Sequence, residues 1–418
     1  MSDLSGLEIL RVGVPIPNVD PTAGGGFEFQ RMIFDEILCR VAESRSKDDQ
    51  TIHFIPIATS PEHAAKWSLG PDSVLNVFPS KSLRLRSGLQ RRLRGLRCPE
   101  RPLPDWKTLA GSAAVKKMAK HIDVIWSLQP AVISDQLPFI LTVWDLQHRL
   151  QPFFPEVSRS GEWEGRQHSY ATNACKAFLN VVGTKRGADE LQRFYGIDPA
   201  RLLINAFPCP PPVALKREEG AKLLKRLSLS SNQFLLYPAQ FWAHKNHLTA
   251  LLALRQLVDQ GHTLKLVLTG SDKGSLSAID QHIDQLDLRC WVVNAGFVER
   301  HDLAALYSHC FALIYPSFFG PDNIPPLEAM SYRVPALVAD VPGAYEQYGD
   351  AVLRFDPGRP DQLVASVTSL LYETGLRESL IRQGLDLVNC LTPASYVDRI
   401  VAFLSENLVA LRCAAMAA

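Results

Sequence analysis

IYPSFFGPDNIPPLEAMSYRVPALVAD, residues 314–340, is the most informative stretch of this chain. It opens at the end of a short apolar run, which is typical of a buried strand, and a loop follows directly. Pro325 and Pro326 then predict a helix start, because the first N–H groups of a helix have no intrahelical partner and proline is tolerated there. The apolar run 334–339 predicts a parallel strand covered on both faces. The order strand, loop, helix, strand indicates an α/β protein whose loop lies where such proteins bind ligands.

The start of the expected helix suits an anion, since a helix N-terminus presents free N–H donors and a partial positive charge. Glu328 lies in the same first turn, and its carboxylate would repel a phosphate group. We therefore expect Glu328 to accept hydrogen bonds from ribose hydroxyls beside a diphosphate. On spacing alone, a glutamate that only caps the helix is an equally open alternative.

The segments 325–340 and 349–357 resemble the nucleotide-sugar signature of the retaining glycosyltransferases of family four (glycosyl transferases group 1). The fold of that family is the two-domain GT-B arrangement. Its motif carries a glutamate eight residues before the position of Glu328, and this chain has Gly320 there. The missing glutamate is associated with the transferred sugar in that family. Gly320 at its position therefore puts recognition of the donor sugar in question. Asp322, or backbone groups of Asn323 and Ile324, are the candidates to replace it.

Length and composition set the broad class. A chain of 418 residues exceeds one ordinary hydrophobic core and predicts two domains. The net charge of +1 gives no overall positive field, so a nucleic-acid partner is not expected. The eight cysteines are scattered, which favours reduced thiols of a cytoplasmic protein over disulfides or a zinc site. No apolar run is long enough to span a bilayer.

A glycine-rich loop follows the first expected strand, at 7–15. Gly24, Gly25 and Gly26 remove side chains where backbone must approach a ligand closely, and helical spacing begins directly after them. The loop is not GxGxxG, so a dinucleotide site is only weakly indicated and an ordinary tight turn is an open alternative. The resemblance implies a glycine-rich loop here, near donor phosphates and acceptor, which makes Gly25 and Gly26 candidates for donor binding.

Polar residues follow the strand expected at 139–145, a position typical of a cleft wall. The family often has a histidine directly before Asp145, and this chain has Trp144 there. His148 is the nearby imidazole. The resemblance makes Asp145 and His148 candidate catalytic residues, with His148 in reach of the donor sugar or the acceptor hydroxyl. A loop histidine bonded to backbone is the alternative for His148.

A second cluster, AQFWAHKNH, lies between a strand expected at 234–237 and a helix. The family has an arginine at the position of Gln240 and a lysine at Lys245, so the lysine is kept and the arginine is not. A compact cation between a strand end and a helix start can bind phosphate, which makes Lys245 a catalytic candidate, and a surface lysine is the alternative. The donor-binding candidates implied by the resemblance are Gly25, Gly26, Gln240, Lys245, Asn246, Gly270, Asp322, Asn323, Ile324, Pro325, Leu327 and Glu328.

The segment 81–97, KSLRLRSGLQRRLRGLR, combines seven basic residues with a narrow leucine stripe. A basic amphipathic helix can lie on an anionic membrane surface. A solvated helix that packs its leucines on the domain is equally open, because Gly88 and Gly95 weaken a helix.

Together these patterns predict an α/β protein of the GT-B fold, with two doubly wound Rossmann-like domains facing across a cleft. We expect an acceptor-side domain at 1–207, a nucleotide-sugar domain at 214–390 and a helix at 391–418 that crosses back to the first domain. The proline-rich segment 207–213 suits the linker between them.

The resemblance implies a metal-independent hexosyltransferase that moves a sugar from a nucleotide-diphosphate sugar to an acceptor hydroxyl with retention of configuration. Surface polysaccharide or glycan assembly is the implied setting, with a saccharide or lipid-linked acceptor, and mannose is one candidate sugar. No cofactor besides the donor substrate and no metal are expected. The expected location is the cytoplasm, with the inner face of the plasma membrane as an extension through 81–97. A nucleotide-sugar epimerase of the same fold and an inactive nucleotide-sugar-binding protein are the alternatives.

Overall fold

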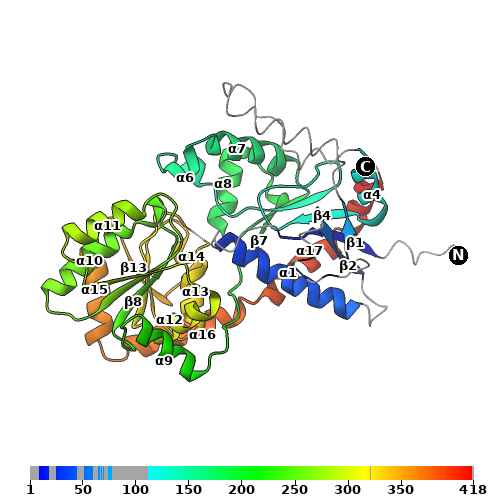
Figure 1. Ribbon diagram of the computed structural model, residues 1–418. Coiled ribbons are helices and arrows are strands. Elements are labelled where there is room, and N and C mark those ends of the chain that lie inside the picture. The colour runs from blue at the N-terminus through cyan, green and yellow to red at the C-terminus, as the bar shows by residue number, and fades with distance from the viewer. Residues whose placement is uncertain are drawn as a thin grey trace.

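The computed structural model describes residues 9–17, 25–44, 51–59, 65, 67, 69, 74–77, 112–320 and 322–416, and the basic segment 81–97 lies outside them. The described part forms two α/β units, each a parallel sheet between helices (Figure 1). One sheet has seven strands in the order β3-β2-β1-β4-β5-β6-β7, and the other has six in the order β10-β9-β8-β11-β12-β13. The prediction of two Rossmann-like domains in a GT-B fold is confirmed.

The strands of the first sheet are short, and its central strands β4, β5 and β6 are fully buried, as expected where a sheet is covered on both faces. The strand predicted at 7–15 is observed from Leu10, and it pairs in parallel with neighbours on both sides. The strands are β1 Leu10–Pro15, β2 Ile52–Ala58, β3 Leu75–Asn76, β4 Val124–Ser127, β5 Phe139–Thr142, β6 Leu179–Val182 and β7 Leu202–Ile204.

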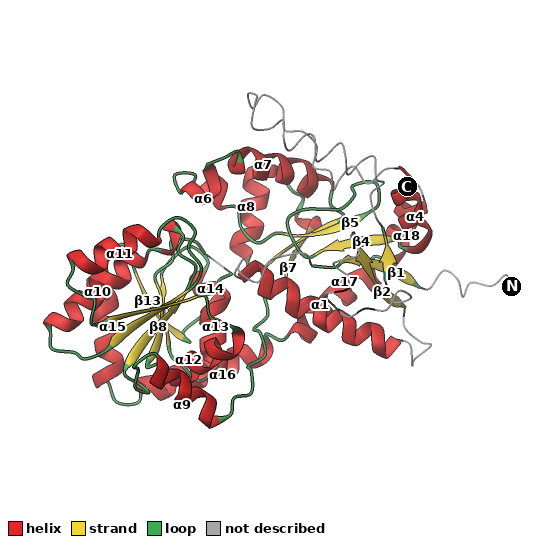
Figure 2. Cartoon of the chain, viewed as in Figure 1, coloured by secondary structure: helices red, strands yellow, loops and turns green. Residues whose placement is uncertain are grey.

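Helices on both faces of this sheet supply its core (Figure 2). Helix α1 buries Phe29, Ile33 and Ile37, whose spacing places them on one helical face. Helix α8 is capped by Thr184, whose hydroxyl accepts from the Gly187 N–H at 3.2 Å. The helices are α1 Gly25–Ser44, α4 Ser112–His121, α5 Gln147–Leu150, α6 Pro155–Ser158, α7 Glu162–Ser169 and α8 Lys185–Tyr195, with a π-helical turn at Tyr170–Ala174 and a 3-10 turn at Pro199–Arg201.

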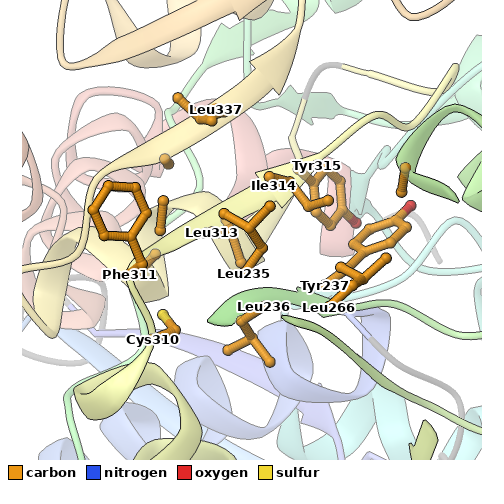
Figure 3. Packing of buried hydrophobic residues seen from close by; sticks show 14 of the residues in the cluster. Leu235, Leu236, Tyr237, Leu266, Cys310, Phe311, Leu313, Ile314, Tyr315 and Leu337 are labelled. Atoms are coloured by element: carbon orange, nitrogen blue, oxygen red, sulfur yellow. The ribbon is translucent and has the colours of Figure 1, made fainter. Parts of the chain in front are cut away.

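The second sheet forms the core of the other domain. Figure 3 shows Leu235 packed beside Leu313, and both side chains are buried. The strand predicted at 334–339 is observed over a shorter range, from Ala336. The strands are β8 Phe234–Pro238, β9 Lys265–Thr269, β10 Val292–Gly296, β11 Ala312–Tyr315, β12 Ala336–Ala339 and β13 Val352–Phe355.

The helices of the second domain include the one predicted in the stretch 314–340. Helix α13 begins at Ile324, one residue before the first of its two prolines. The helices are α9 Arg217–Arg226, α10 His247–Asp259, α11 Leu276–Gln285, α12 Arg300–His309, α13 Ile324–Ser331, α14 Ala344–Tyr348, α15 Pro360–Tyr372 and α16 Leu376–Cys390, with a 3-10 turn at Ala243–Lys245.

The C-terminal helices α17 Pro393–Glu406 and α18 Leu408–Met416 lie on the first domain, and Figure 1 shows α17 beside α1. Phe29 of α1 and Tyr396 of α17 meet edge to face, with ring centroids 5.6 Å apart. Arg40 and Asp398 form an ion pair at 2.8 Å between the same two helices. The chain end is thereby attached to the N-terminal core, while the domain limits at 207, 214 and 390 stay a prediction.

Candidate active site between the two domains

The loops that follow strands β5 and β11 meet between the two domains. Gln147 Nε2 donates to the Gly320 carbonyl at 2.8 Å, and Gln151 Nε2 donates to the Phe318 carbonyl at 2.8 Å. Both loops lie at the carboxyl ends of parallel strands, the sheet edge at which α/β proteins bind ligands. A cavity at this junction is lined by residues of both domains, among them Trp144, Asp145, Gln147, Glu190, Gly320 and Asp322.

Helix α13 offers fewer N–H donors at its start than most helices do. A helix start leaves about four backbone N–H groups without intrahelical partners. Pro325 and Pro326 occupy two of these places and carry no N–H. The N–H groups of Asn323 and Ile324 remain, and the Asn323 side chain does not cap the helix. Leu327 is fully buried and Ile324 nearly so, which leaves these two donor-binding candidates only their backbone groups.

The loop before α13 is held in place by hydrogen bonds of its own. The Tyr348 hydroxyl donates to the Asn323 carbonyl at 2.7 Å, and Asn323 Nδ2 donates to the Phe319 carbonyl at 2.8 Å. A backbone fixed in this way needs little rearrangement to bind a ligand, and donors of this kind are the most effective for stabilising developing charge.

Glu328 faces α1 of the other domain and helix α12. Its Oε2 accepts from the Tyr307 hydroxyl at 3.0 Å, and Oε1 makes no hydrogen bond to any described residue. Burial, reinforced by the charge of Glu28, raises the pKa of Glu328 to about 7, although Tyr307, Arg300 and Arg31 act in the opposite direction. Glu328 is therefore hydrogen-bonded to Tyr307 and does not cap the start of α13. Its Oε1 is available to a ligand.

Lys245 ends the 3-10 turn between β8 and α10. Its Nζ donates to the Tyr315 hydroxyl at 2.8 Å and lies 5.0 Å from the centre of that ring. Tyr315 is the last residue of β11, so the lysine lies at the carboxyl end of the strand that leads to α13. Figure 3 shows Tyr315 near Tyr237 of β8, whose hydroxyl donates to the Lys245 carbonyl. Lys245 is therefore a partly buried cation beside the loop that precedes α13.

Three neighbours of Lys245 were expected to bind the donor. The Asn246 side chain is used within the protein, because Nδ2 donates to the carbonyls of Pro316 at 3.0 Å and Pro357 at 2.8 Å. Gly270 allows two loops to approach, since a Cβ atom there would lie 2.4 Å from the Ala239 carbonyl oxygen. Gln240 lies on the loop that Gly270 approaches, and a Cβ atom on Gly270 would lie 2.8 Å from its Cα. The structure thus shows that Asn246 anchors the end of the lysine turn, while Gly270 allows the chain at Ala239–Gln240 to approach closely.

Gly25 and Gly26 form the start of α1, while Gly24 lies outside the described residues. A Cβ atom on Gly26 would lie 2.7 Å from Cζ3 of Trp144, whereas nothing lies within 4 Å of a Cβ on Gly25. The indole of Trp144, at the position of the family's histidine, therefore packs against the glycine loop. Gly26 makes room for that indole, and Gly25 keeps open space beside it.

Asp145 lies three residues beyond the observed end of β5, in the loop that leads into helix α5. Its Oδ1 accepts from Arg166 Nη1 at 2.7 Å and from the Gln147 N–H at 2.9 Å. Burial alone would raise the pKa of Asp145, but the charge of Arg166 and these hydrogen bonds more than offset it and lower the pKa. Asp145 is therefore ionised at neutral pH and lines the cavity between the domains.

His148 lies in the interior of the first domain. Its side chain has 0% exposure, it stacks on Tyr170 with ring centroids 5.3 Å apart, and Nε2 lies 3.0 Å from the Tyr195 hydroxyl. Burial, together with the charge of Arg166, lowers the pKa of His148 to about 4. In this arrangement the ring does not reach the cleft, so the structure gives no support to direct contact with a sugar. The expected alternative, a bond to backbone, is also not observed, since its partner is Tyr195.

Asp322 faces the first domain from the loop before α13. Its backbone has a φ of 74°, and its N–H donates to Gln347 Oε1 at 2.8 Å. Burial, reinforced by the charges of Glu346, Asp145 and Glu190, raises the pKa of Asp322 well above its ordinary value. At the family's glutamate position, a Cβ atom on Gly320 would lie 2.4 Å from Val341 Cγ2, so a larger residue there would need Val341 to move.

An ion-pair group beside Glu328 was not predicted from the sequence. Glu28 pairs with Arg31 of its own helix through the Nε atom at 3.1 Å, and its Oε1 lies 3.6 Å from Arg300 Nε of the second domain. A glutamate and arginine three residues apart on a helix were visible in the sequence, but Arg300 was not a recognisable partner. The charge of Glu28 helps to raise the pKa of Glu328, whereas Arg300 and Arg31 oppose that rise, so all three charges act at the same junction.

Neither a cluster of metal ligands nor a membrane-spanning helix is found among the described residues. Within the described ranges no group of three or more histidine, cysteine, aspartate or glutamate side chains could hold a metal ion. The helices in those ranges are also all too short or too polar to cross a bilayer.

Part of the chain is similar in sequence to known glycosyltransferases. The family model described as Glycosyl transferases group 1 matches residues 223–386. O-antigen chain mannosyltransferase B of Escherichia coli is 26% identical over 216 residues, which are 51% of this chain and 56% of that protein. O-antigen chain mannosyltransferase RfbU of Salmonella typhimurium is 26% identical over 183 residues, 44% of this chain and 47% of that protein. The chain thus spans about half the length of the curated relatives it matches.

Solved structures match over nearly the whole chain. A glycosyltransferase from Rickettsia africae has a TM-score of 0.67 at 13% identity, covering 96% of this chain and 99% of the other. Anabaena HepE in complex with UDP and glucose has a TM-score of 0.66 at 14% identity, with 95% and 100% covered. WaaG, a glycosyltransferase involved in lipopolysaccharide biosynthesis, has a TM-score of 0.62 at 14% identity, with 94% and 99% covered. At these identities the likeness concerns the fold.

Proposed function

We propose that this protein is a retaining glycosyltransferase of family four, which moves a sugar from a nucleotide-diphosphate sugar to an acceptor hydroxyl without a metal ion. The observation that carries the proposal is the position of Lys245, whose Nζ lies 2.8 Å from the hydroxyl of Tyr315. Tyr315 ends the strand that leads into the α13 loop, so one cation, two free N–H groups and Glu328 belong to the same edge of the sheet.

The chemistry follows from where charge develops. As the bond to the sugar breaks, negative charge grows on the leaving diphosphate, and a preorganised cation and N–H donors lower the energy of that state. Lys245 is the cation, and the N–H groups of Asn323 and Ile324 are the donors. The departing phosphate oxygen helps to accept the proton of the acceptor hydroxyl, so no separate protein base is required. Lys245 and the α13 start thereby supply the charge stabilisation for which other transferases use a metal.

We assign the remaining roles by their places in the site. Glu328 binds the ribose through its free Oε1, while Gly25 and Gly26 face the donor phosphates. Asp145 and Asp322 line the cavity between the domains, the position expected for the transferred sugar and the acceptor. Gln240, Asn246, Gly270, Pro325 and Leu327 shape the surrounding loops. His148 supports the Asp145 loop from inside.

The matched relatives favour a particular substrate class. Two of them are O-antigen chain mannosyltransferases, which makes GDP-mannose the first donor to test. We accordingly propose a cytoplasmic role in surface polysaccharide assembly, with a saccharide or lipid-linked acceptor and with the segment 81–97 as contact to the membrane. The domains proposed for these tasks are 1–207 for the acceptor, 214–390 for the nucleotide sugar and 391–418 as the returning helix.

The test is a panel of GDP-, UDP- and dTDP-sugars assayed for released nucleotide, with and without a polyprenyl-phosphate-linked saccharide and with and without EDTA. A transferase releases nucleotide only when acceptor is present, and its activity survives EDTA. NMR of the product then shows whether the anomeric configuration is retained. Release that depends on water alone would indicate an epimerase. Binding without release would indicate an inactive partner, which the departures at Gly320 and Gln240 make a specific alternative.

A further inference from the structure

One carboxylate of the first domain reaches across to the turn that holds Lys245. Glu156, on helix α6, accepts through Oε1 from the His244 N–H at 2.8 Å. The same oxygen also accepts from Nδ1 of the His244 ring. The two side chains are only 5% and 11% exposed, so water competes little for these hydrogen bonds. His244 directly precedes Lys245 in the chain.

The contact determines the state of the His244 ring. Burial, with the neighbouring charge of Lys245, lowers the pKa of His244 to about 4, although the hydrogen bond to Glu156 acts in the opposite direction. A neutral imidazole carries one proton, and here that proton must lie on Nδ1 to be donated to the carboxylate. Glu156 therefore selects the Nδ1–H tautomer and leaves Nε2 as an acceptor.

The same histidine connects the lysine turn to the loop before α13. Its ring stacks on Phe319, with centroids 3.8 Å apart and planes 9° apart. The carbonyl of His244 also accepts from the Phe318 N–H at 2.9 Å. Glu156 thus contacts a residue that touches both parts of the proposed phosphate site, and it does so from the opposite domain.

The Glu156 carboxylate uses only one of its two oxygens in this contact. Oε2 is buried and makes no hydrogen bond to any described residue. Burial acts to raise the pKa of Glu156, but the hydrogen bonds from His244 outweigh it and lower the pKa, so the contact holds an ionised carboxylate.

We propose that Glu156 is a positioning residue that fixes the Lys245 turn and the Phe318–Phe319 backbone for phosphate binding when the two domains are closed. This inference rests on the proposed function, in which Lys245 binds the donor phosphates. It adds that the phosphate site is completed by a side chain of the acceptor-side domain, so that closure of the cleft and arrangement of the lysine turn are coupled.

The first arm of the test does not depend on activity. Histidine side chains labelled with nitrogen-15 report their tautomer by NMR, and a His244→Phe variant identifies the His244 signals. We expect the Nδ1–H tautomer in the wild type and in Glu156→Gln, whose amide oxygen can still accept, and its loss in Glu156→Ala. A wild-type His244 in the Nε2–H tautomer would overturn the proposal.

The second arm measures binding of GDP and of UDP by calorimetry. We expect Glu156→Ala to weaken whichever nucleotide binds by about tenfold or more, and Glu156→Gln to restore most of the affinity. Glu164→Ala is the control, because Glu164 is an exposed residue of the same domain with no such contact. If Glu156→Ala binds like the wild type, the proposal fails. If neither nucleotide binds the wild type, the proposed function fails, while the NMR arm still decides whether Glu156 sets the state of His244.

A second variant separates positioning from domain closure in general. The Glu346 carboxylate also crosses the cleft, where it accepts from the Lys185 N–H and from the Arg186 N–H at 3.2 Å, away from the lysine turn. Glu346→Ala should therefore leave the His244 tautomer unchanged and weaken the nucleotide less than Glu156→Ala does. Equal losses of nucleotide affinity in the two variants would overturn the positioning role.

Discussion

Gly183 and Asp322 lie against each other across the cleft, and a Cβ atom on Gly183 would lie only 2.0 Å from Oδ1 of Asp322. Gly183 follows strand β6 of the first domain, whereas Asp322 precedes α13 of the second. The backbone of Asp322 cannot easily retreat, because its N–H donates to Gln347 Oε1 at 2.8 Å. The observed closed arrangement of the two domains therefore leaves no room for a side chain at position 183 unless the Asp322 carboxylate moves.

Gly183→Ala should shift the protein toward an open arrangement. Overpacking at a fitted contact costs about 1–3 kcal/mol, which corresponds to a decrease of about 5- to 150-fold in the ratio of closed to open protein. Small-angle X-ray scattering should show a larger radius of gyration with unchanged helix content. Adding Asp322→Gly, a residue that tolerates the φ of 74°, should restore the compact form. A Gly183→Ala protein as compact as the wild type would contradict the fit.

Lys245→Ala should lower kcat/KM by about two orders of magnitude, by analogy with the loss of one preorganised donor. The physical reason is that Lys245 is the cation at the carboxyl end of β11, where we place the leaving diphosphate. Tyr315→Phe is the matched variant, since it removes only the hydroxyl that holds Nζ and should cost much less. The measurement is released nucleotide under steady-state conditions. Near-normal turnover of Lys245→Ala would remove the lysine from the mechanism.

Glu328→Gln should weaken binding of the nucleoside diphosphate by roughly 1–2 kcal/mol, because a charge-assisted hydrogen bond to ribose is replaced by a neutral one. The pKa of about 7 makes this loss depend on pH. Ionised Glu328 is the better acceptor, so wild-type affinity should rise as pH increases from 6 to 8, while the affinity of the variant stays flat. Calorimetry at the two pH values measures the difference. Equal affinities of both proteins at pH 8 would exclude the ribose role.

The same substitution should stabilise the fold at high pH. The pKa of Glu328 is raised from 4.5 to about 7, so between these values the folded state holds a proton that the unfolded state has lost. The free energy of unfolding therefore falls as pH rises through this window, by about 1.4 kcal/mol for each pKa unit. Glu328→Gln removes that loss, so the variant should match the wild type near pH 4 and exceed it at pH 8. Urea denaturation at both pH values tests this, with Glu164→Gln as the control. If Glu328→Gln and the wild type differ in free energy of unfolding by the same amount at pH 4 and at pH 8, the prediction is wrong.

The parts of the site that the sequence predicted are those encoded locally. The apolar run that ends at Tyr315 predicts a strand, and the pair Pro325–Pro326 predicts a helix start a few residues later. Strand, loop and helix therefore follow from the local sequence alone. The consequence of the two prolines for the number of N–H donors was equally local and could have been read from the sequence. Lys245 was found through the family pattern, and the structure shows what holds it, the hydroxyl of Tyr315.

The parts that escaped prediction depend on partners far apart in the chain. Glu156 and His244 are 88 residues apart, and only the packing of the two domains brings them together. His148 shows a second limit, because a polar residue after a strand can face a cleft or the core. Here Tyr195, 47 residues away, supplies a hydroxyl that makes burial acceptable, and no pattern near His148 indicates this.

The last prediction concerns the segment 81–97, which lies outside the described residues. Its seven basic residues surround a leucine stripe, and a lipid-linked acceptor would have to be reached at a bilayer surface. Each basic residue near an anionic surface contributes on the order of 1 kcal/mol within a Debye length, and the leucines add apolar burial. Binding to vesicles should therefore require anionic lipid, weaken with salt and disappear when Arg91, Arg92 and Arg94 become glutamate. If the wild type fails to co-sediment with anionic vesicles at low salt, the segment is a solvated helix whose leucines belong to the first domain.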